Sequence, residues 1–133
     1  TMKFDADKLG RMIEAECAEV CFALLHGSAK EGDVRPGGDI DIALYMDGRA
    51  TLEVFQKVIE IVSELAPGVK CDPGVLNGAE PVYRFEALKG RLLFCRDQER
   101  YLDFFSLTCR EYESRMADYR RQHKYRLEYQ GHE

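Results

Sequence analysis

The chain has 133 residues, and 45% of them are hydrophobic. This length is typical of one folded domain and this composition supplies a core, so we expect a single domain over residues 1–133 and exclude intrinsic disorder. The formal net charge of −5 disfavours nucleic acid as a partner, and we expect no direct DNA binding. No apolar run approaches the roughly 20 residues that cross a bilayer, and the five cysteines form no C-x-x-C pair. These features predict a cytoplasmic protein without a membrane contact.

The first part of the chain predicts one helix and two strands. Apolar residues three and four positions apart predict a helix over residues 9–20. The unbroken apolar run 20–25 predicts a strand that is buried on both faces. Glycine and proline interrupt the segment 27–38, which predicts a loop. Polar and apolar residues then alternate over 39–45, which predicts a second strand with one face in water.

The rest of the chain predicts two more strands and three more helices. Because Pro73 cannot donate to a strand ladder and Gly74 packs no side chain, we expect the strand 69–76 at a sheet edge or with a bulge. A single helix over 97–129 would be about 50 Å long, which exceeds the width of a compact domain, so it either breaks or protrudes. The other predicted elements are helices over 52–65 and 81–88 and a last strand or extended segment over 91–95.

Two short motifs contain residue types that suit phosphate chemistry. Gly27 and Ser28 end the first strand, and Asp39 and Asp41 open the second strand after ten intervening residues. Residues two apart on a strand face the same side, so both carboxylates can converge on a divalent cation, for which Mg²⁺ is the best fit. Gly27 lets the backbone approach a phosphate, and Ser28 offers a hydroxyl. Each motif alone is also typical of a solvated turn or strand, but together they predict phosphoryl or nucleotidyl transfer.

The segments that carry these motifs resemble a known family. Residues 24–28 and 39–44 resemble the signature of nucleotidyltransferases with a polymerase-β-type palm, and residues 72–77, 81–85 and 90–97 extend the resemblance to the minimal nucleotidyltransferases. These are the MNT or MntA-type antitoxins encoded beside HEPN toxins. The resemblance implies an α+β fold with a polymerase-β-like palm: a small mixed β-sheet with the active-site carboxylates on one face, helices on the other, and a helical C-terminus.

The resemblance also implies a reaction. It implies transfer of AMP from ATP to a hydroxyl group, that of a tyrosine, on a cognate HEPN ribonuclease toxin, which silences the toxin. Such transfer uses a two-metal Mg²⁺ site. By resemblance, Asp39 and Asp41 are catalytic and bind the metals, and Asp72 completes the metal site and helps to deprotonate the acceptor.

The nucleotide-binding residues follow from the same resemblance. Gly27 and Ser28 hold the triphosphate. Family members often carry an arginine soon after the Gly-Ser pair, and here Lys30, or Arg35 further on, supplies the positive charge. A serine often precedes the first aspartate of the family, whereas this chain has Gly38.

Two alternative functions stay open at this point. A non-catalytic antitoxin would neutralise the toxin by binding alone and would keep its affinity without the aspartates. A small-molecule nucleotidyltransferase would normally need an added substrate-binding domain, for which a chain of this length has no room. The basic residues near the end of the final helix either form a solvated face or contact the partner, and we expect Tyr119 and Tyr125 in such a contact.

Overall fold

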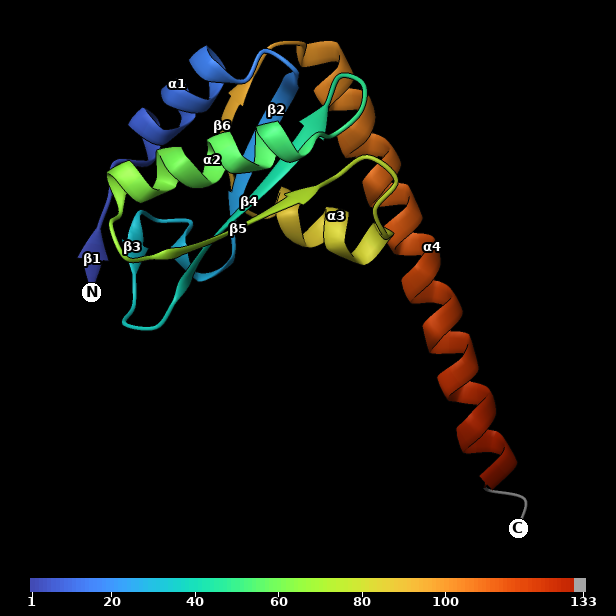
Figure 1. Cartoon of the computed structure of the whole chain (residues 1–133). Coiled ribbons are helices and arrows are strands. Elements are labelled where there is room, and N and C mark those ends of the chain that lie inside the picture. Colours follow the sequence, from blue (N-terminus) through green and yellow to red (C-terminus); the bar gives the residue numbers. More distant parts are fainter. Residues whose placement is uncertain (131–133) are drawn as a thin grey trace.

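The structure is a computed structural model and describes residues 1–130 (Figure 1). Helices and strands alternate along most of the chain. In order, the elements are β1 (Met2–Lys3), α1 (Ala6–Glu16), β2 (Val20–His26), the 3₁₀ turn η1 (Gly27–Ala29), β3 (Asp33–Val34), β4 (Asp39–Met46), α2 (Leu52–Leu65), β5 (Lys70–Val75), α3 (Pro81–Leu88), β6 (Arg91–Cys95) and α4 (Gln98–Gln130).

A four-stranded mixed sheet forms the centre, with the strand order β5-β4-β2-β6. β2 is antiparallel to both of its neighbours, while β4 and β5 are parallel and are joined through α2. β5 is therefore an edge strand, as Pro73 and Gly74 predicted, and its pairing with β4 contains no register shift. β1 and β3 form a separate two-stranded ribbon.

The larger core lies between the sheet and the helices α1 and α2. Both helices are amphipathic and bury one face, which includes Leu9 and Ile13 of α1 and Val58 of α2. α1 begins and ends earlier than the predicted helix 9–20. Asp5 caps its first turn by accepting a hydrogen bond from the backbone N–H of Lys8 at 3.0 Å, and the chain must leave the helix before β2 starts.

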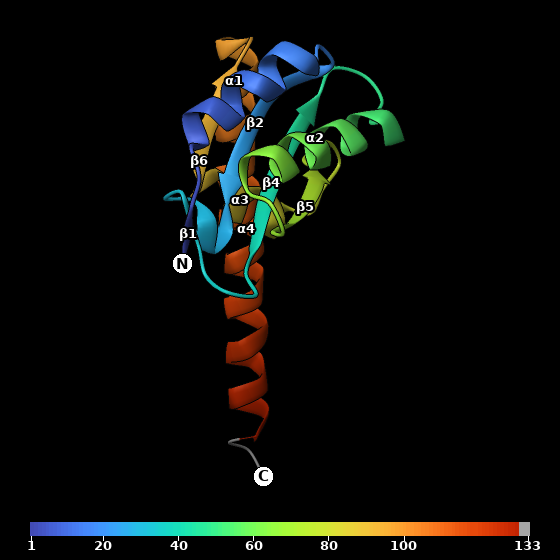
Figure 2. The same ribbon diagram turned by 60° about the vertical axis from the view of Figure 1, so that its left-hand side comes forward.

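A second core covers the other face of the sheet. The α+β class with a small mixed sheet and a helical C-terminus is confirmed, but helices cover both faces and not one, because α3 and the start of α4 pack on the carboxylate face (Figures 1 and 2). β2 explains the difference, since every residue from Val20 to Leu25 is buried. Phe22 and Leu24 face away from α1 and α2, and they need their own apolar cover, which Ala87 and Phe104 help to supply.

α4 is one unbroken helix of 33 residues that extends beyond the body of the protein (Figures 1 and 2). Of the two predicted outcomes, it protrudes and does not break. Its first half packs on α3 through the stacked rings of Tyr112 and Phe85, whose centroids lie 3.8 Å apart. Two ion pairs add to this contact, Glu111 with Arg84 at 3.6 Å and Arg115 with Glu80 at 3.7 Å.

The five cysteines are free thiols, and two of them are buried. None of the helices within residues 1–130 is long and apolar enough to cross a membrane.

Candidate active site

Asp39 and Asp41 lie on the face of β4 that is turned toward α3. The strand alternates, so Ile40 and Ile42 point the other way and are completely buried in the core beneath α1 and α2. Asp39 and Asp41 are themselves half-buried. The two carboxylates share one face of the strand, as their spacing predicted.

Asp72 lies beside Asp41 on the neighbouring strand. β5 pairs with β4 so that Asp72 is the register partner of Asp41, and paired strands lie about 4.8 Å apart. Cys71 packs against the core beneath α1 and α2, so Asp72 faces the opposite side and is exposed there. All three predicted carboxylates are therefore on the same face of two adjacent strands, although Pro73 and Gly74 directly follow Asp72.

The Gly27-Ser28 pair forms the turn that leaves β2, directly beside the β4 carboxylates. Gly27 has a φ of +76°, which side-chain-bearing residues rarely adopt. A Cβ atom at Gly27 would lie 2.5 Å from Oδ2 of Asp41, so the Asp41 carboxylate occupies the space that a side chain would need. Ser28 is exposed at the start of η1. Because Gly27 has no side chain, the Asp41 carboxylate lies directly against this exposed backbone turn.

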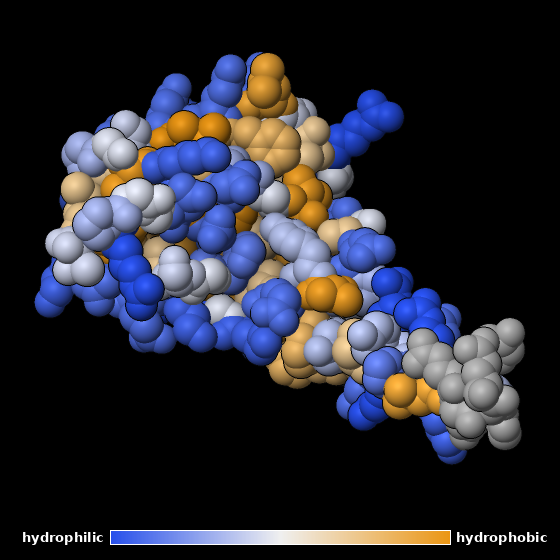
Figure 3. Space-filling view, turned by 90° about the horizontal axis from the view of Figure 1, so that it is seen from below, coloured by the Kyte–Doolittle hydropathy of each residue, from blue (hydrophilic) through white to orange (hydrophobic). Residues whose placement is uncertain are grey.

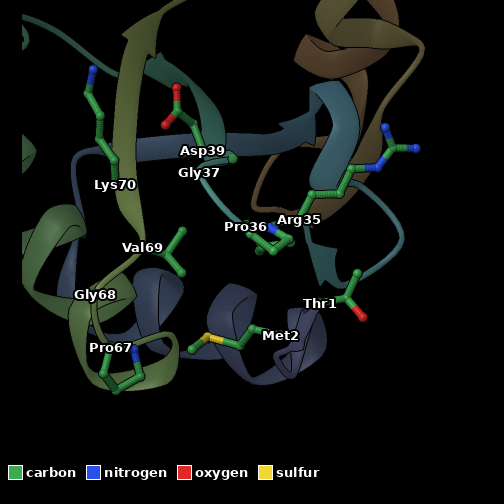
Figure 4. Close-up of a pocket in the computed structure, with 12 residues that line it drawn as sticks. Thr1, Met2, Arg35, Pro36, Gly37, Asp39, Pro67, Gly68, Val69 and Lys70 are labelled. Carbon is green, nitrogen blue, oxygen red and sulfur yellow. The ribbon is translucent and has the colours of Figure 1, made fainter.

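The two candidate cations lie on different sides of this turn. Lys30 directly follows η1 and lines a small pocket together with Gly27. Arg35 lies on the loop before β4, in a pocket of about 490 Å³ that Asp39 and Lys70 also line (Figure 4). In Figure 4 the Arg35 side chain extends away from Asp39. Of the two candidate cationic residues, Lys30 therefore lies beside Gly27.

His26 and Tyr83 belong to the same face, and sequence reasoning did not include them among the site residues. His26 is the register partner of Asp41 on β2, and its ring meets the edge of the Tyr83 ring, with centroids 5.7 Å apart. His26 Nε2 is buried without a hydrogen-bond partner among the described residues. The position of His26 next to Gly27 was a possible signal, whereas that of Tyr83 depends on how α3 packs.

Burial sets the ionisation of this pair. Desolvation lowers the pKa of His26, which nearby Asp41 and Asp72 partly offset. Burial, followed by the charges of Asp72 and Asp41, raises the pKa of Tyr83. Burial therefore disfavours the charged form of both side chains that border the carboxylates, the imidazolium of His26 and the phenolate of Tyr83.

Comparison with known proteins identifies the family. The family model described as polymerase beta, nucleotidyltransferase matches residues 8–99. The chain belongs to the polymerase-β nucleotidyltransferase family. The matched segment includes the Gly27-Ser28 turn and all three aspartates, and it ends at the start of α4. A comparison with curated proteins found no match.

Solved structures share the fold of this nucleotidyltransferase. A crystal structure of a toxin-antitoxin MntA-HpeT mutant has a TM-score of 0.73 and 16% identity, covering 92% of this chain and 98% of that chain. A toxin-antitoxin structure with AMP-PNP has a TM-score of 0.71 and 17% identity, covering 92% and 98%. For a tri-AMPylated Shewanella oneidensis HEPN toxin in complex with MNT antitoxin, the TM-score is 0.65 and the identity 16%, covering 92% and 95%. The polymerase-β-like α+β fold expected from the resemblance is confirmed, apart from the helices that cover the carboxylate face.

The family implies a divalent metal, and the donor set of this nucleotidyltransferase can be tested for it. Within the described part of the chain, no three His, Cys, Asp or Glu side chains converge closely enough to hold a metal ion by themselves. Mg²⁺ is commonly held by one or two carboxylates together with waters and substrate phosphates. Asp39 and Asp41 on one face, beside an open turn, fit that kind of shared site.

Proposed function

We propose that this nucleotidyltransferase transfers AMP from ATP, in the presence of Mg²⁺, to a tyrosine hydroxyl of a HEPN-type toxin, and that it acts in the cytoplasm as the antitoxin of that toxin. The observation that carries the proposal is the Asp41 carboxylate directly over the Gly27 turn in a chain of this family. The AMPylated HEPN toxin in complex with a protein of the same fold supports the choice of reaction and partner.

The proposed mechanism assigns one task to each group. Asp39 and Asp41 would hold Mg²⁺, which supplies charge neutralisation at the phosphates when it is bound. The exposed backbone of Gly27 and the hydroxyl of Ser28 would bind the phosphate oxygens. Asp72, exposed on the edge strand, would accept the proton of the acceptor hydroxyl.

In the proposed transfer, one bond forms and one bond breaks at the α-phosphorus. The acceptor oxygen forms a bond to the α-phosphorus, and the bond from that phosphorus to the oxygen bridging it to the β-phosphorus breaks. Pyrophosphate leaves with the electron pair of the broken bond, and the acceptor proton passes to Asp72. The position of Asp72 at the outer strand β5 leaves it accessible to a large acceptor such as a protein.

We further propose that the partner binds the projecting end of α4. All side chains from 118 to 127, here named the α4 tail, are exposed, and hydrophobic and hydrophilic ones are mixed along this projection (Figure 3). Tyr119 and Tyr125 are 63% and 72% exposed. The α4 tail carries four basic residues and one acidic residue, whereas the whole chain has a net charge of −5. An acidic groove on the toxin would complement such a segment.

Intact-protein mass spectrometry tests the proposed transfer. The full chain is incubated with ATP, Mg²⁺ and the product of the adjacent gene, which is the expected HEPN-type partner, and that product is then weighed. We expect a gain of one or more AMP units, and loss of that gain in the double variant Asp39→Asn, Asp41→Asn. The variant Glu60→Gln, Glu64→Gln is a matched control, because it removes two carboxylates from exposed positions on α2.

The outcomes separate the three functions. The proposed transferase would be supported if the partner gains AMP with the unchanged chain and with the Glu60→Gln, Glu64→Gln control, but not with the aspartate variant. A stable complex without any AMP gain would overturn transfer and leave an antitoxin that acts by binding. With neither a gain nor a complex, the toxin proposal would be wrong, and a small-molecule acceptor would become the better hypothesis.

A further inference from the structure

A pocket of about 270 Å³ lies beside the Gly27 turn, and its lining residues come from distant parts of the sequence. Gly27 and Lys30 belong to the turn after β2, whereas Lys89 and Gly90 connect α3 to β6. Glu86 of α3 completes the lining. An adjoining pocket of about 370 Å³ is again lined by Lys30, Lys89 and Gly90, together with Glu31 and Arg91. The two lysines therefore face a common hollow at the edge of the candidate active site.

The strand order places this hollow and the carboxylates on the two sides of β2. β2 lies between β4, which carries Asp39 and Asp41, and β6, which follows Gly90 directly. Two strand spacings amount to about 10 Å. A chain of phosphates that begins at the carboxylates and crosses the Gly27 turn therefore runs toward Lys30 and Lys89.

Gly90 accounts for the close approach of Lys89 to the turn. A Cβ atom at Gly90 would overlap the carbonyl oxygen of Leu25 and lie 2.9 Å from the Cα atom of His26. Only a glycine lets the connection between α3 and β6 pack this tightly against the end of β2. The backbone of Lys89 is thus held next to Gly27 by a tightly packed segment.

Positive side chains outnumber negative ones at the hollow, with Lys30, Lys89 and Arg91 against Glu31 and Glu86. Lys89 is paired with Glu86 at 3.0 Å, and both side chains are about half exposed, 55% and 54%. Such an exposed pair between residues three positions apart contributes little to stability, so a phosphate can replace the carboxylate at low cost. Lys30 has no ion-pair partner among the described residues.

We infer that Lys89, together with Lys30, binds the β- and γ-phosphates of the nucleoside triphosphate, and that Glu86 is the resting partner of Lys89 which these phosphates displace. The inference rests on the proposed function and adds a phosphate-binding residue to it. The second cation comes from the α3–β6 connection instead of the loop after the turn.

Binding of ATP and of AMP to the full chain, measured by calorimetry with Mg²⁺ present, tests this site. We expect Lys89→Gln to weaken ATP binding about tenfold, the usual effect of losing one charge-assisted hydrogen bond, and to leave AMP binding unchanged. Glu86→Gln removes the competing carboxylate, so it should strengthen ATP binding several-fold. Lys57→Gln is the matched control, because Lys57 is exposed on α2, across the sheet from the site.

We expect ATP binding to weaken in Lys89→Gln and to strengthen in Glu86→Gln, while AMP binding is unchanged in Lys89→Gln. Unchanged ATP binding by Lys89→Gln, or an equal loss for AMP and ATP, would overturn the inference even if AMP transfer to the partner is observed. If the pattern is found but no transfer occurs, the phosphate site stands and the proposed acceptor is wrong. Absence of ATP binding by the unchanged protein would overturn both.

Discussion

At the scale of single residues, Gly27 combines two constraints that can be separated by substitution. Its φ of +76° disfavours any side chain, and a Cβ would also meet the Asp41 carboxylate. Gly27→Ala should therefore lower the free energy of unfolding by about 1–3 kcal/mol and also displace Asp41, which should abolish AMP transfer. Urea unfolding and the transfer assay measure the two effects.

Gly78 provides the control for that substitution. It has a similar φ of +70°, but nothing lies within 4 Å of the position its Cβ would take. Gly78→Ala should carry the backbone cost alone and keep full transfer activity. Equal activity of the Gly27 and Gly78 variants would contradict the view that Asp41 needs the empty space at Gly27.

The residue scale is also where the sequence was most informative. The alternation over 39–45 placed Asp39 and Asp41 on one face, and the resemblance added Asp72. Spacing could not include Tyr83 or Lys89, because each reaches the site only through the packing of α3 on the sheet. Local patterns record the periodicity of one element, and they carry no information about which distant segments will meet.

At the scale of elements, α3 packs on β5 with Tyr83 beside Gly74. The Tyr83 hydroxyl occupies the space beside Gly74 that a Cβ would need. Gly74→Ala should therefore push α3 away and lower the free energy of unfolding by about 1–3 kcal/mol. Removing the hydroxyl relieves the overlap, so the double variant Gly74→Ala, Tyr83→Phe should be more stable than Gly74→Ala alone.

A double-mutant cycle in urea measures this coupling. The two sites are in contact, so we expect an interaction energy of about 0.5 kcal/mol or more. Its sign should show that Tyr83→Phe restores part of the stability that Gly74→Ala removes. Additive effects would mean that α3 is held elsewhere, for instance by the stacked rings of Phe85 and Tyr112. The cycle needs no nucleotide and is therefore independent of the proposed activity.

The elements differ in how far the sequence determined them. Helices over 52–65 and 81–88 were predicted with their observed bounds, because Pro67 and Gly68 follow the first helix, and Pro81 and Gly90 bound the second. Placement of the helices on one face was wrong, although the apolar run 20–25 already required cover on both faces. The outcome for the final helix was undetermined by sequence, since the contacts of its first half with α3 are tertiary.

At the scale of the whole molecule, the chain divides into a body that contains the candidate active site and a helix that projects from it. The last ion pair between α4 and the body is that of Arg115 with Glu80. Beyond Ala117 every side chain to Leu127 is exposed. Removing the α4 tail therefore removes almost no buried surface from the body, and its folding should not depend on it.

A chain that ends at Ala117 tests what the α4 tail is for. We expect it to unfold at nearly the same urea concentration as the full chain and to bind ATP with the same affinity, because the site lies on β2, β4 and β5. Complex formation with the HEPN-type partner, measured by calorimetry, should be lost, since the exposed tyrosines and the basic residues are absent. A full chain with Tyr119→Ser and Tyr125→Ser should show the same loss, which separates the side chains from helix length. If the shortened chain bound the partner with undiminished affinity, the contact would have to lie on the body, beside the carboxylates themselves.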